Sequence, residues 1–240
     1  MKKINFQVNK QEGFELFIED GVFTPTATTN YLIDSVIDYR DSINSTESIL
    51  DLGCGCGPVG ISVYKKFNVK NLYASDFSKE AVSVTKENFN LHKVNGVVKQ
   101  GSLLDPWVGH KFDIIIDDIS GISTTVASLS SWFDGVPCES GEDGSKLTIE
   151  VLRNSKKFLK PGGLLFFPII SFSNVKKIEE EAKKLFKKVN LLSNNTWPFP
   201  DELMKHNKIL ANLKEKDLIT YEDKFGIKLA FTKIMVAQND

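Results

Sequence analysis

The sequence predicts an α/β protein with a seven-stranded, mostly parallel sheet, a C-terminal antiparallel hairpin and helices on both faces. Short β-branched and apolar runs alternate with longer segments whose apolar residues recur at helical spacing, which is typical of strand–helix–strand units. Near the end this alternation gives way to two extended runs around a Lys-Phe-Gly turn. Because 41% of the 240 residues are hydrophobic, one sizeable core can form.

The first 45 residues are less regular than the rest. In them "GVFTPTATTNYLIDSVID" predicts a loop followed by a helix that is capped near Thr28 or Thr29, because a threonine hydroxyl can accept from the first helical turn. We therefore expect an N-terminal lead-in over residues 1–45 and the main domain over residues 46–240.

The main domain contains six runs that predict strands: "SILDL", "NLYASD", "GVVKQG", "FDIIID", "LLFFPII" and "VNLLS". Between them, helices are predicted over "VGISVYKKF", "KEAVSVTKENFNLH" and "GSKLTIEVLRNSKKFL". A further helix is expected where Val175, Ile178, Ala182 and Leu185 share one face and lysines form the solvated face. The tail predicts one helical stretch, "DELMKHNKILANLKEK", and then the hairpin "LITYEDKFGIKLAFTKIMVA".

Residues 49–60, "ILDLGCGCGPVG", contain two overlapping glycine patterns. From Gly55 the spacing is G-x-G-x-x-G, which cradles a dinucleotide pyrophosphate. From Asp51 it is D-x-G-x-G-x-G, the spacing of loops that receive S-adenosylmethionine. A structural turn that binds nothing needs neither the alternating glycines nor acids at both neighbouring strand ends. The loop is therefore a candidate cofactor site.

The residues around the loop favour S-adenosylmethionine over a dinucleotide. A carboxylate at Asp51 repels a pyrophosphate but can hold an ammonium group, directly or through water. Pro58 removes one N–H that a phosphate at a helix N-terminus would use. Asp76, at the end of the next strand, would meet a ribose diol of either cofactor and does not discriminate.

Five motifs resemble, in this order, class I S-adenosylmethionine-dependent methyltransferases of the HemK-like, small-domain type: "LDLGCGCGPVGISVYKKF", "ASDFSKEAVSVTKEN", "VKQGSLLDP", "FDIIIDDISGIS" and "SGEDGSKLTIEVLRNSKKFLKPGGLLFF". The likeness spans roughly residues 22–172 and implies a Rossmann-like fold. The lead-in "GVFTPTATTNYLI" resembles the family segment that closes over the cofactor and contains Thr28. By position, the resemblance implies ten cofactor-binding residues: Thr28, Asp51, Gly53, Cys54, Gly55, Gly57, Asp76, Phe77, Ser102 and Leu103.

These positions divide by the part of the cofactor that they would contact. Asp51 and the loop through Gly57 would line the methionine end, and Asp76 would bind the ribose hydroxyls. Phe77 would lie against the adenine, with Ser102 and Leu103 at its edge. Many relatives have an aspartate where this chain has Ser102, so the serine contact is expected to be weaker.

The chain departs from the family after the strand "FDIIID". The family has Asn-Pro-Pro-Tyr there, which holds and stacks on a planar –NH2 group, whereas this chain has Asp118, Ile119, Ser120 and Gly121. A carboxylate can instead accept a proton from a hydroxyl or a cationic amine, so Asp118 and Asp117 are the predicted catalytic residues. For Asp117 a role as a loop cap is an equal alternative.

The favoured function is methyl transfer to an oxygen or a non-planar nitrogen of a small molecule or peptide. One alternative is a HemK-like N-methyltransferase of protein glutamine or nucleic acid, and another is a non-catalytic S-adenosylmethionine-binding subunit. A dehydrogenase is the most distant reading. The segment "DGVPCESGEDGS" (134–145) is expected to form one wall of the acceptor pocket.

Composition narrows the partners and the compartment. The net charge of −1 gives no reason to expect a nucleic-acid partner. "MKKINFQVNKQEGF" lacks the apolar run of a signal peptide, and "LLFFPII" is too short to span a bilayer, so we expect a cytoplasmic protein without membrane contact. Cysteines at 54, 56 and 138 predict neither a disulfide framework nor a zinc site, and we expect no metal.

Overall fold

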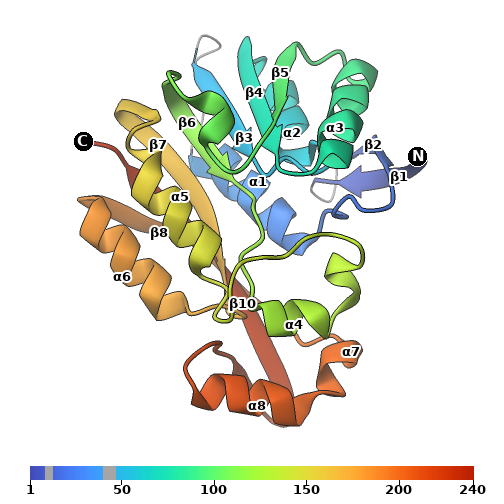
Figure 1. Cartoon of the computed structure of the whole chain (residues 1–240), viewed down its shortest axis with the longest axis vertical. Coiled ribbons are helices and arrows are strands. Elements are labelled where there is room, and N and C mark those ends of the chain that lie inside the picture. The colour runs from blue at the N-terminus through green and yellow to red at the C-terminus, as the bar shows by residue number, and fades with distance from the viewer. Residues whose placement is uncertain (9–12, 40–46) are drawn as a thin grey trace.

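The computed structural model of the chain describes residues 1–8, 13–39 and 47–240, and it has a central sheet with a smaller lobe at one end (Figure 1). The main sheet runs in the order β5-β4-β3-β6-β7-β10-β8. Five of these strands are parallel neighbours: β3 (Ser48–Leu52), β4 (Asn71–Asp76), β5 (Gly96–Gln100), β6 (Phe112–Asp117) and β7 (Leu159–Ile170). The long strand β10 (Ile227–Gln238) is antiparallel to both β7 and β8 (Lys188–Pro198).

Helices cover both faces of this sheet, as the alternation of strands and helices predicted (Figure 1). One face packs against α1 (Ala27–Tyr39), α2 (Pro58–Phe67) and α3 (Lys79–Leu91). The other packs against α5 (Lys146–Ser155) and α6 (Val175–Leu185). Because successive side chains of a strand point to opposite faces, Ile114 and Ile116 enter the first core and Ile115 enters the second. This explains why "FDIIID" is apolar without alternation.

The N-terminal lead-in contains a hairpin that the sequence analysis missed. Strands β1 (Lys2–Gln7) and β2 (Gly13–Ile18) pair antiparallel, and every second residue of β2 is buried. The hairpin is fixed to α3 by Asn88, whose Oδ1 accepts from the Phe17 amide and whose Nδ2 donates to the Phe17 carbonyl. The boundary predicted between residues 45 and 46 lies outside the described residues.

The cap predicted at Thr28 or Thr29 is wrong. Helix α1 begins at Ala27, and the carbonyl of Thr26 accepts from the Asn30 amide. Thr26 therefore occupies the capping position, two residues before the first of the two threonines that the sequence predicted. The hydroxyls of Thr28 and Thr29 contact Thr232 and Asp118 instead, so tertiary contacts use the side chains that local capping would have used.

The lobe is formed by the segment that directly follows β6 and by the region between β8 and β9. These parts pack around a third apolar core that includes Phe172, Leu203 and Leu210. It contains α4 (Thr124–Ser128), the short 3₁₀ helix η2 (Ser131–Phe133), α7 (Asp201–Met204) and α8 (Asn207–Glu215). The single helical stretch predicted over 201–216 is therefore wrong, because the backbone leaves helical geometry at His206. This break lets the short helix and the longer one both bury leucines in the same core.

The C-terminal hairpin is present but uneven. β9 (Glu222–Lys224) pairs with only the first three residues of β10, and the turn lies at Phe225 and Gly226. Both turn residues have positive φ, as a tight hairpin turn requires. With β9 attached, the sheet has eight strands in the part of the chain that the structure describes, one more than predicted. No helix among the described residues has the length and apolarity needed to cross a membrane.

Candidate functional site

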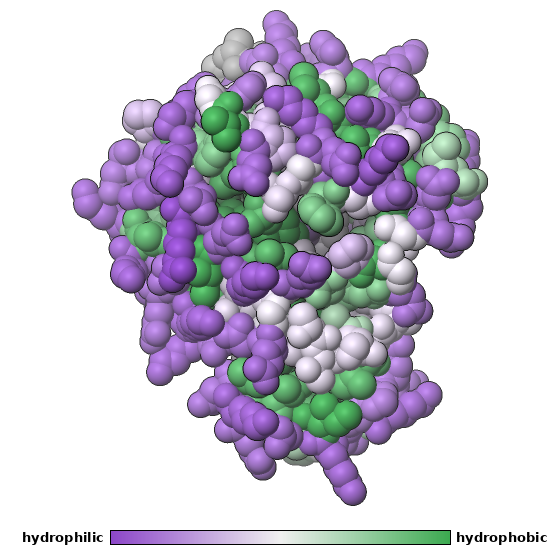
Figure 2. Space-filling model, in the orientation of Figure 1, coloured by the Kyte–Doolittle hydropathy of each residue, from purple (hydrophilic) through white to green (hydrophobic). Residues whose placement is uncertain are grey.

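A cavity of about 460 Å³ opens at the carboxyl ends of the parallel strands, between the sheet and the lobe. Its walls come from the loops after β3, β4, β5 and β6, from the start of α1, and from the lobe. Ligands of open α/β sheets bind at this edge. In the space-filling view, pale and hydrophobic side chains gather at the waist between the sheet and the lobe (Figure 2).

The glycine loop after β3 forms one end of the cavity, and each of its three glycines has a positive φ. A Cβ on Gly53 would lie 2.8 Å from the Ile119 side chain, and one on Gly57 would lie 3.3 Å from Thr85. A Cβ on Gly55 would meet nothing closer than 4.0 Å. Gly53 and Gly57 therefore allow close packing of the protein on itself, whereas Gly55 leaves open space beside the cavity.

Helix α3 holds this loop through two polar side chains that the sequence analysis did not select. Thr85 Oγ1 donates to the Gly55 carbonyl at 2.8 Å, and Asn88 Nδ2 donates to the Cys56 carbonyl at 2.8 Å. Both side chains are fully buried. Their position three residues apart on the apolar face of a helix is the signal that could have found them, because a buried polar group needs a partner. Cys54 and Cys56 are buried within the same loop.

The loop after β4 carries the predicted ribose and adenine contacts. Asp76 lines the cavity, and its carboxylate accepts from the Gly55 and Ser78 amides at 2.9 Å each. Burial raises the pKa of Asp76, and these amide hydrogen bonds oppose the rise. The Phe77 side chain is 67% exposed and borders the same cavity. Ser102 and Leu103, after β5, complete this end.

Asp51 lies behind the glycine loop and does not line the cavity. It is fully buried, and its Oδ2 accepts from the Gly60 amide at 2.9 Å. Its Oδ1 has no hydrogen-bond partner among the described residues. Burial raises its pKa to about 8, although the Gly60 amide opposes the rise. Its contact with a methionine ammonium stays a prediction, as does the binding role of Gly57, which is also outside the lining.

We expect the variant Asp51→Asn to remove a pH dependence of stability. The native chain keeps the Asp51 proton up to about pH 8, whereas the unfolded chain releases it near 3.8, so wild-type stability falls as pH rises between these values. Asparagine cannot titrate. The free energy of unfolding of the variant relative to wild type should therefore increase by up to about 1.4 kcal/mol per pH unit between pH 5 and 7.

Urea unfolding at pH 5, 6 and 7 measures this difference. The matched control is Asp105→Asn, because Asp105 is exposed and does not line the cavity. A stability difference for Asp51→Asn that does not change with pH would show that the buried carboxyl is not protonated in the native chain.

The two aspartates after β6 occupy different places. Asp118 lines the cavity, and its Oδ2 accepts from Thr29 Oγ1 at 3.0 Å. Burial raises its pKa to about 7, with a further rise from the Asp117 charge, whereas the Thr29 hydroxyl lowers it. Asp117 is buried away from the cavity and its Oδ1 accepts from the Ile119 amide at 3.3 Å. Of these two aspartates, only Asp118 can contact a molecule in the cavity.

The other half of the cavity is lined by apolar and aromatic side chains of the lobe. Val136, Pro137 and Glu139 of the segment 134–145 line it, and the role of this segment in an acceptor pocket stays a prediction. The sequence analysis missed four aromatic residues of this region: Phe23, Trp132, Phe133 and Trp197. They come from distant parts of the chain, so no local motif announces them. The site therefore has aromatic side chains of its own, although the tyrosine of the family motif is absent.

Comparison with known proteins agrees with this geometry. The family model described as methyltransferase small domain matches residues 17–118. The chain is 29% identical over 166 residues to the release factor glutamine methyltransferase of Clostridium acetobutylicum, a match that covers 65% of this chain and 58% of that protein. It is 26% identical over 196 residues to a putative protein N5-glutamine methyltransferase of Methanocaldococcus jannaschii, covering 82% of this chain and 95% of the relative.

Among solved structures, a 16S rRNA N2 methyltransferase of T. thermophilus in complex with AdoMet and guanosine superposes with a TM-score of 0.64. That match covers all of this chain and 50% of the other at 11% identity, so it supports the fold alone. The chain spans little more than half the length of the release factor relative. Residues 17–118 thus match the methyltransferase small-domain model, and over its longer matches the chain is similar to HemK-like glutamine methyltransferases.

Proposed function

We propose that this protein is an S-adenosylmethionine-dependent methyltransferase that acts on an oxygen or a non-planar nitrogen of a small molecule or peptide. One observation carries the proposal. A single cavity joins the glycine loop, with Asp76 and Phe77, to a carboxylate, Asp118, that stands among apolar side chains. The first group suits a cofactor, and the second suits a nucleophile that must lose a proton.

The residues at the loop fit S-adenosylmethionine. The space beside Gly55 admits a ligand close to the backbone. Each Asp76 oxygen accepts one amide and retains a lone pair for a ribose hydroxyl. Behind the loop, Asp51 Oδ1 has no hydrogen-bond partner among the described residues, so it can accept from an ammonium group, and a bound cation would favour loss of the Asp51 proton.

When bound, this cofactor supplies an electrophilic methyl group: the S–CH3 bond breaks with its electron pair left on sulfur, and a bond from the acceptor atom to the methyl carbon forms. The protein's own part is to hold the acceptor and receive its proton. Asp118 is placed for this, and a pKa of about 7 lets it exist as a carboxylate at neutral pH and still accept a proton. Thr29 fixes the carboxyl orientation through its hydrogen bond to Oδ2.

N-methylation of protein glutamine is the second candidate, because the two relatives above carry that activity in their names. The sequence favours it less. Asp118, Ile119 and Ser120 stand where the family has the rigid Asn-Pro-Pro-Tyr, and the charge and basicity of a carboxylate are not needed to hold a planar amide. A non-catalytic S-adenosylmethionine-binding subunit remains the third candidate, and it differs from the first two by having no acceptor.

The test has a binding arm and a transfer arm. Calorimetry should detect adenosylhomocysteine and not NAD, because the loop is flanked by carboxylates and Pro58 lacks an N–H. With a labelled methyl donor, the protein should not label a bacterial release factor, ribosomal RNA or DNA stoichiometrically. Binding of NAD without adenosylhomocysteine would reverse the cofactor assignment. Efficient labelling of any of these macromolecules would replace the proposed acceptor class.

A further inference from the structure

We infer that the acceptor of this site is a cationic amine carried on a flat, apolar body. The inference rests on the proposed function and narrows its acceptor. Two independent features of the cavity carry it: the sign of the charges on its wall, and an aromatic corner formed by Trp132 and Trp197 that lines the same cavity.

The wall of the cavity is acidic. Among the described residues that line it, the charged side chains are Asp76, Asp118 and Glu139, and none is lysine, arginine or histidine. The whole chain has 30 lysines and arginines, so this is a local selection rather than a shortage of cations. An anionic acceptor would meet only like charges in a partly desolvated space, whereas a cation would be attracted. The same reasoning disfavours a nucleic acid, which brings a phosphate with every nucleotide.

The three carboxylates are not equivalent. Both oxygens of Asp76 already accept amide hydrogen bonds at the cofactor end. Asp118 accepts only from Thr29, through Oδ2, and its Oδ1 has no hydrogen-bond partner among the described residues. Glu139 is exposed at the rim. The acceptor half therefore presents one partly buried carboxylate with a free oxygen, together with a solvated acid at its mouth, and an ammonium can donate to the first.

The aromatic corner is formed by Trp132 of η2 and Trp197 of β8, whose ring centroids are 6.0 Å apart with an interplanar angle of 73°. Trp197 is fixed because its Nε1 donates to Thr232 Oγ1 at 3.1 Å. The faces of indole rings bind flat apolar groups and attract cations through their quadrupole. The two indoles are in edge-to-face contact and both line the cavity, so a flat body bound there can lie against them with a positive charge stabilised beside it.

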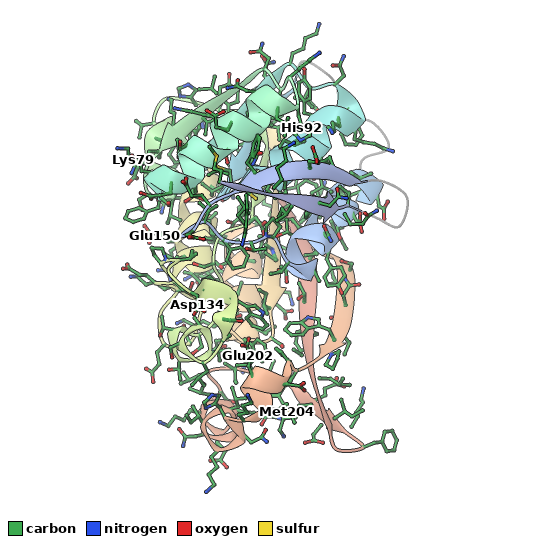
Figure 3. All side chains as sticks on the ribbon, turned by 90° about the vertical axis from the view of Figure 1, so that its right-hand side faces the viewer. Lys79, His92, Asp134, Glu150, Glu202 and Met204 are labelled. Atoms are coloured by element: carbon green, nitrogen blue, oxygen red, sulfur yellow. The ribbon has the colours of Figure 1, made fainter. Side chains whose placement is uncertain are left out.

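The position of Trp132 is set by another part of the lobe. Glu202 of α7 accepts from the Ser131 amide at 3.2 Å and from its hydroxyl at 3.3 Å. Figure 3 shows Glu202 and Asp134, the residue that follows η2, on neighbouring segments of the lobe. In addition to the two tryptophans, Ile122, Val136 and Ile170 give the cavity an apolar lining. This lining stabilises an apolar body and offers few hydrogen bonds to a polar one.

These features select among the acceptors that the proposed function allows. An alcohol or phenol would use the apolar corner but leave the negative charge of Asp118 unpaired. A carboxylate or phosphate would be repelled. An amine uses both halves, since its ammonium can donate to Asp118 and its body can lie in the corner. Asp118 then receives one proton from the ammonium and leaves the nitrogen lone pair free.

The test is calorimetric titration of the protein saturated with adenosylhomocysteine at pH 8, where Asp118 is ionised. The probes are three indoles that differ in one group: tryptamine, tryptophol and indole-3-propionate. The same three groups on a phenyl ring form a second, smaller series. We expect the amine to bind about tenfold or more tightly than the alcohol, and the acid to bind weakest.

Three variants assign the preference to its residues. Asp118→Asn should reduce the amine-to-alcohol ratio to within about twofold. Trp197→Leu should weaken amine and alcohol together by about tenfold while affinity for adenosylhomocysteine is kept, which also reports that the variant is folded. Asp134→Asn is the matched control, because it removes a carboxylate that lies two residues after Trp132 and does not line the cavity. It should change neither the amine-to-alcohol ratio nor the affinity for adenosylhomocysteine.

Other outcomes overturn the inference. Equal or tighter binding of the alcohol or the acid, or no binding of any amine in either series to the loaded protein, would exclude a flat cationic amine. Failure of the proposed function has a different signature, because adenosylhomocysteine itself would then not bind.

Discussion

Asp118→Asn is expected to lower the turnover of methyl transfer by about 10²–10⁴-fold, which is the usual contribution of a positioned proton acceptor. Asparagine keeps the shape of the side chain and an oxygen that can accept from Thr29, so the local structure is preserved. It removes the negative charge and the basicity. Affinity for adenosylhomocysteine should stay nearly unchanged, because asparagine keeps the contact to Thr29 and the predicted ribose and adenine contacts, Asp76 and Phe77, belong to a different loop, after β4.

The pH profile adds a second readout for the same residue. Because a base must be deprotonated to act, wild-type turnover should rise through an apparent pKa of about 7, and the rise should vanish in the variant. Asp117→Asn is the control, and we expect a smaller loss of turnover because that carboxyl does not line the cavity. If Asp118→Asn is as active as wild type, or more active on a planar amide, the carboxylate is not a base.

Asp76→Ala should raise the dissociation constant of adenosylhomocysteine by on the order of 10²–10⁴-fold. A carboxylate that accepts two ribose hydroxyls contributes about 1.5–3 kcal/mol for each charged hydrogen bond. The structure adds a second reason. Asp76 also accepts from the amides of Gly55 and Ser78, so alanine would remove this side-chain link to the glycine loop and leave only the backbone hydrogen bonds from Gly53 and Cys54 to Ser75. Calorimetry with the variant measures the loss.

The two reasons can be separated by a conservative variant. Asp76→Asn keeps one acceptor oxygen, so it should lose less affinity than alanine if hydrogen bonding to the loop dominates. The control is Asp105→Ala, which removes an exposed carboxylate outside the cavity lining and should leave the dissociation constant unchanged. An unchanged affinity in Asp76→Ala would mean that the ribose does not lie at this strand end.

Local pattern was sufficient for the parallel strands of the sheet and for most of the residues that line the glycine-loop end of the cavity. The runs that predict β3, β4 and β6 each end in a residue that the cavity or its supports use, because parallel strands bring their carboxyl ends to one edge. In the N-terminal hairpin, buried and less buried residues alternate along β2. A single pair of short strands is nevertheless too weak a pattern to be distinguished from an irregular segment by sequence.

The sequence by itself determined the α/β class, the position of the glycine loop, and the replacement of Asn-Pro-Pro-Tyr by a segment that begins with Asp118. Each depends on neighbours within a few residues, where backbone and side-chain preferences act directly. Only the tertiary structure decided that Asp118 and not Asp117 faces the cavity, and that Trp132 and Trp197 meet there. Residues 65 positions apart come together because the lobe core and the β8–β10 pairing fold them against one sheet edge, and no local preference encodes that contact.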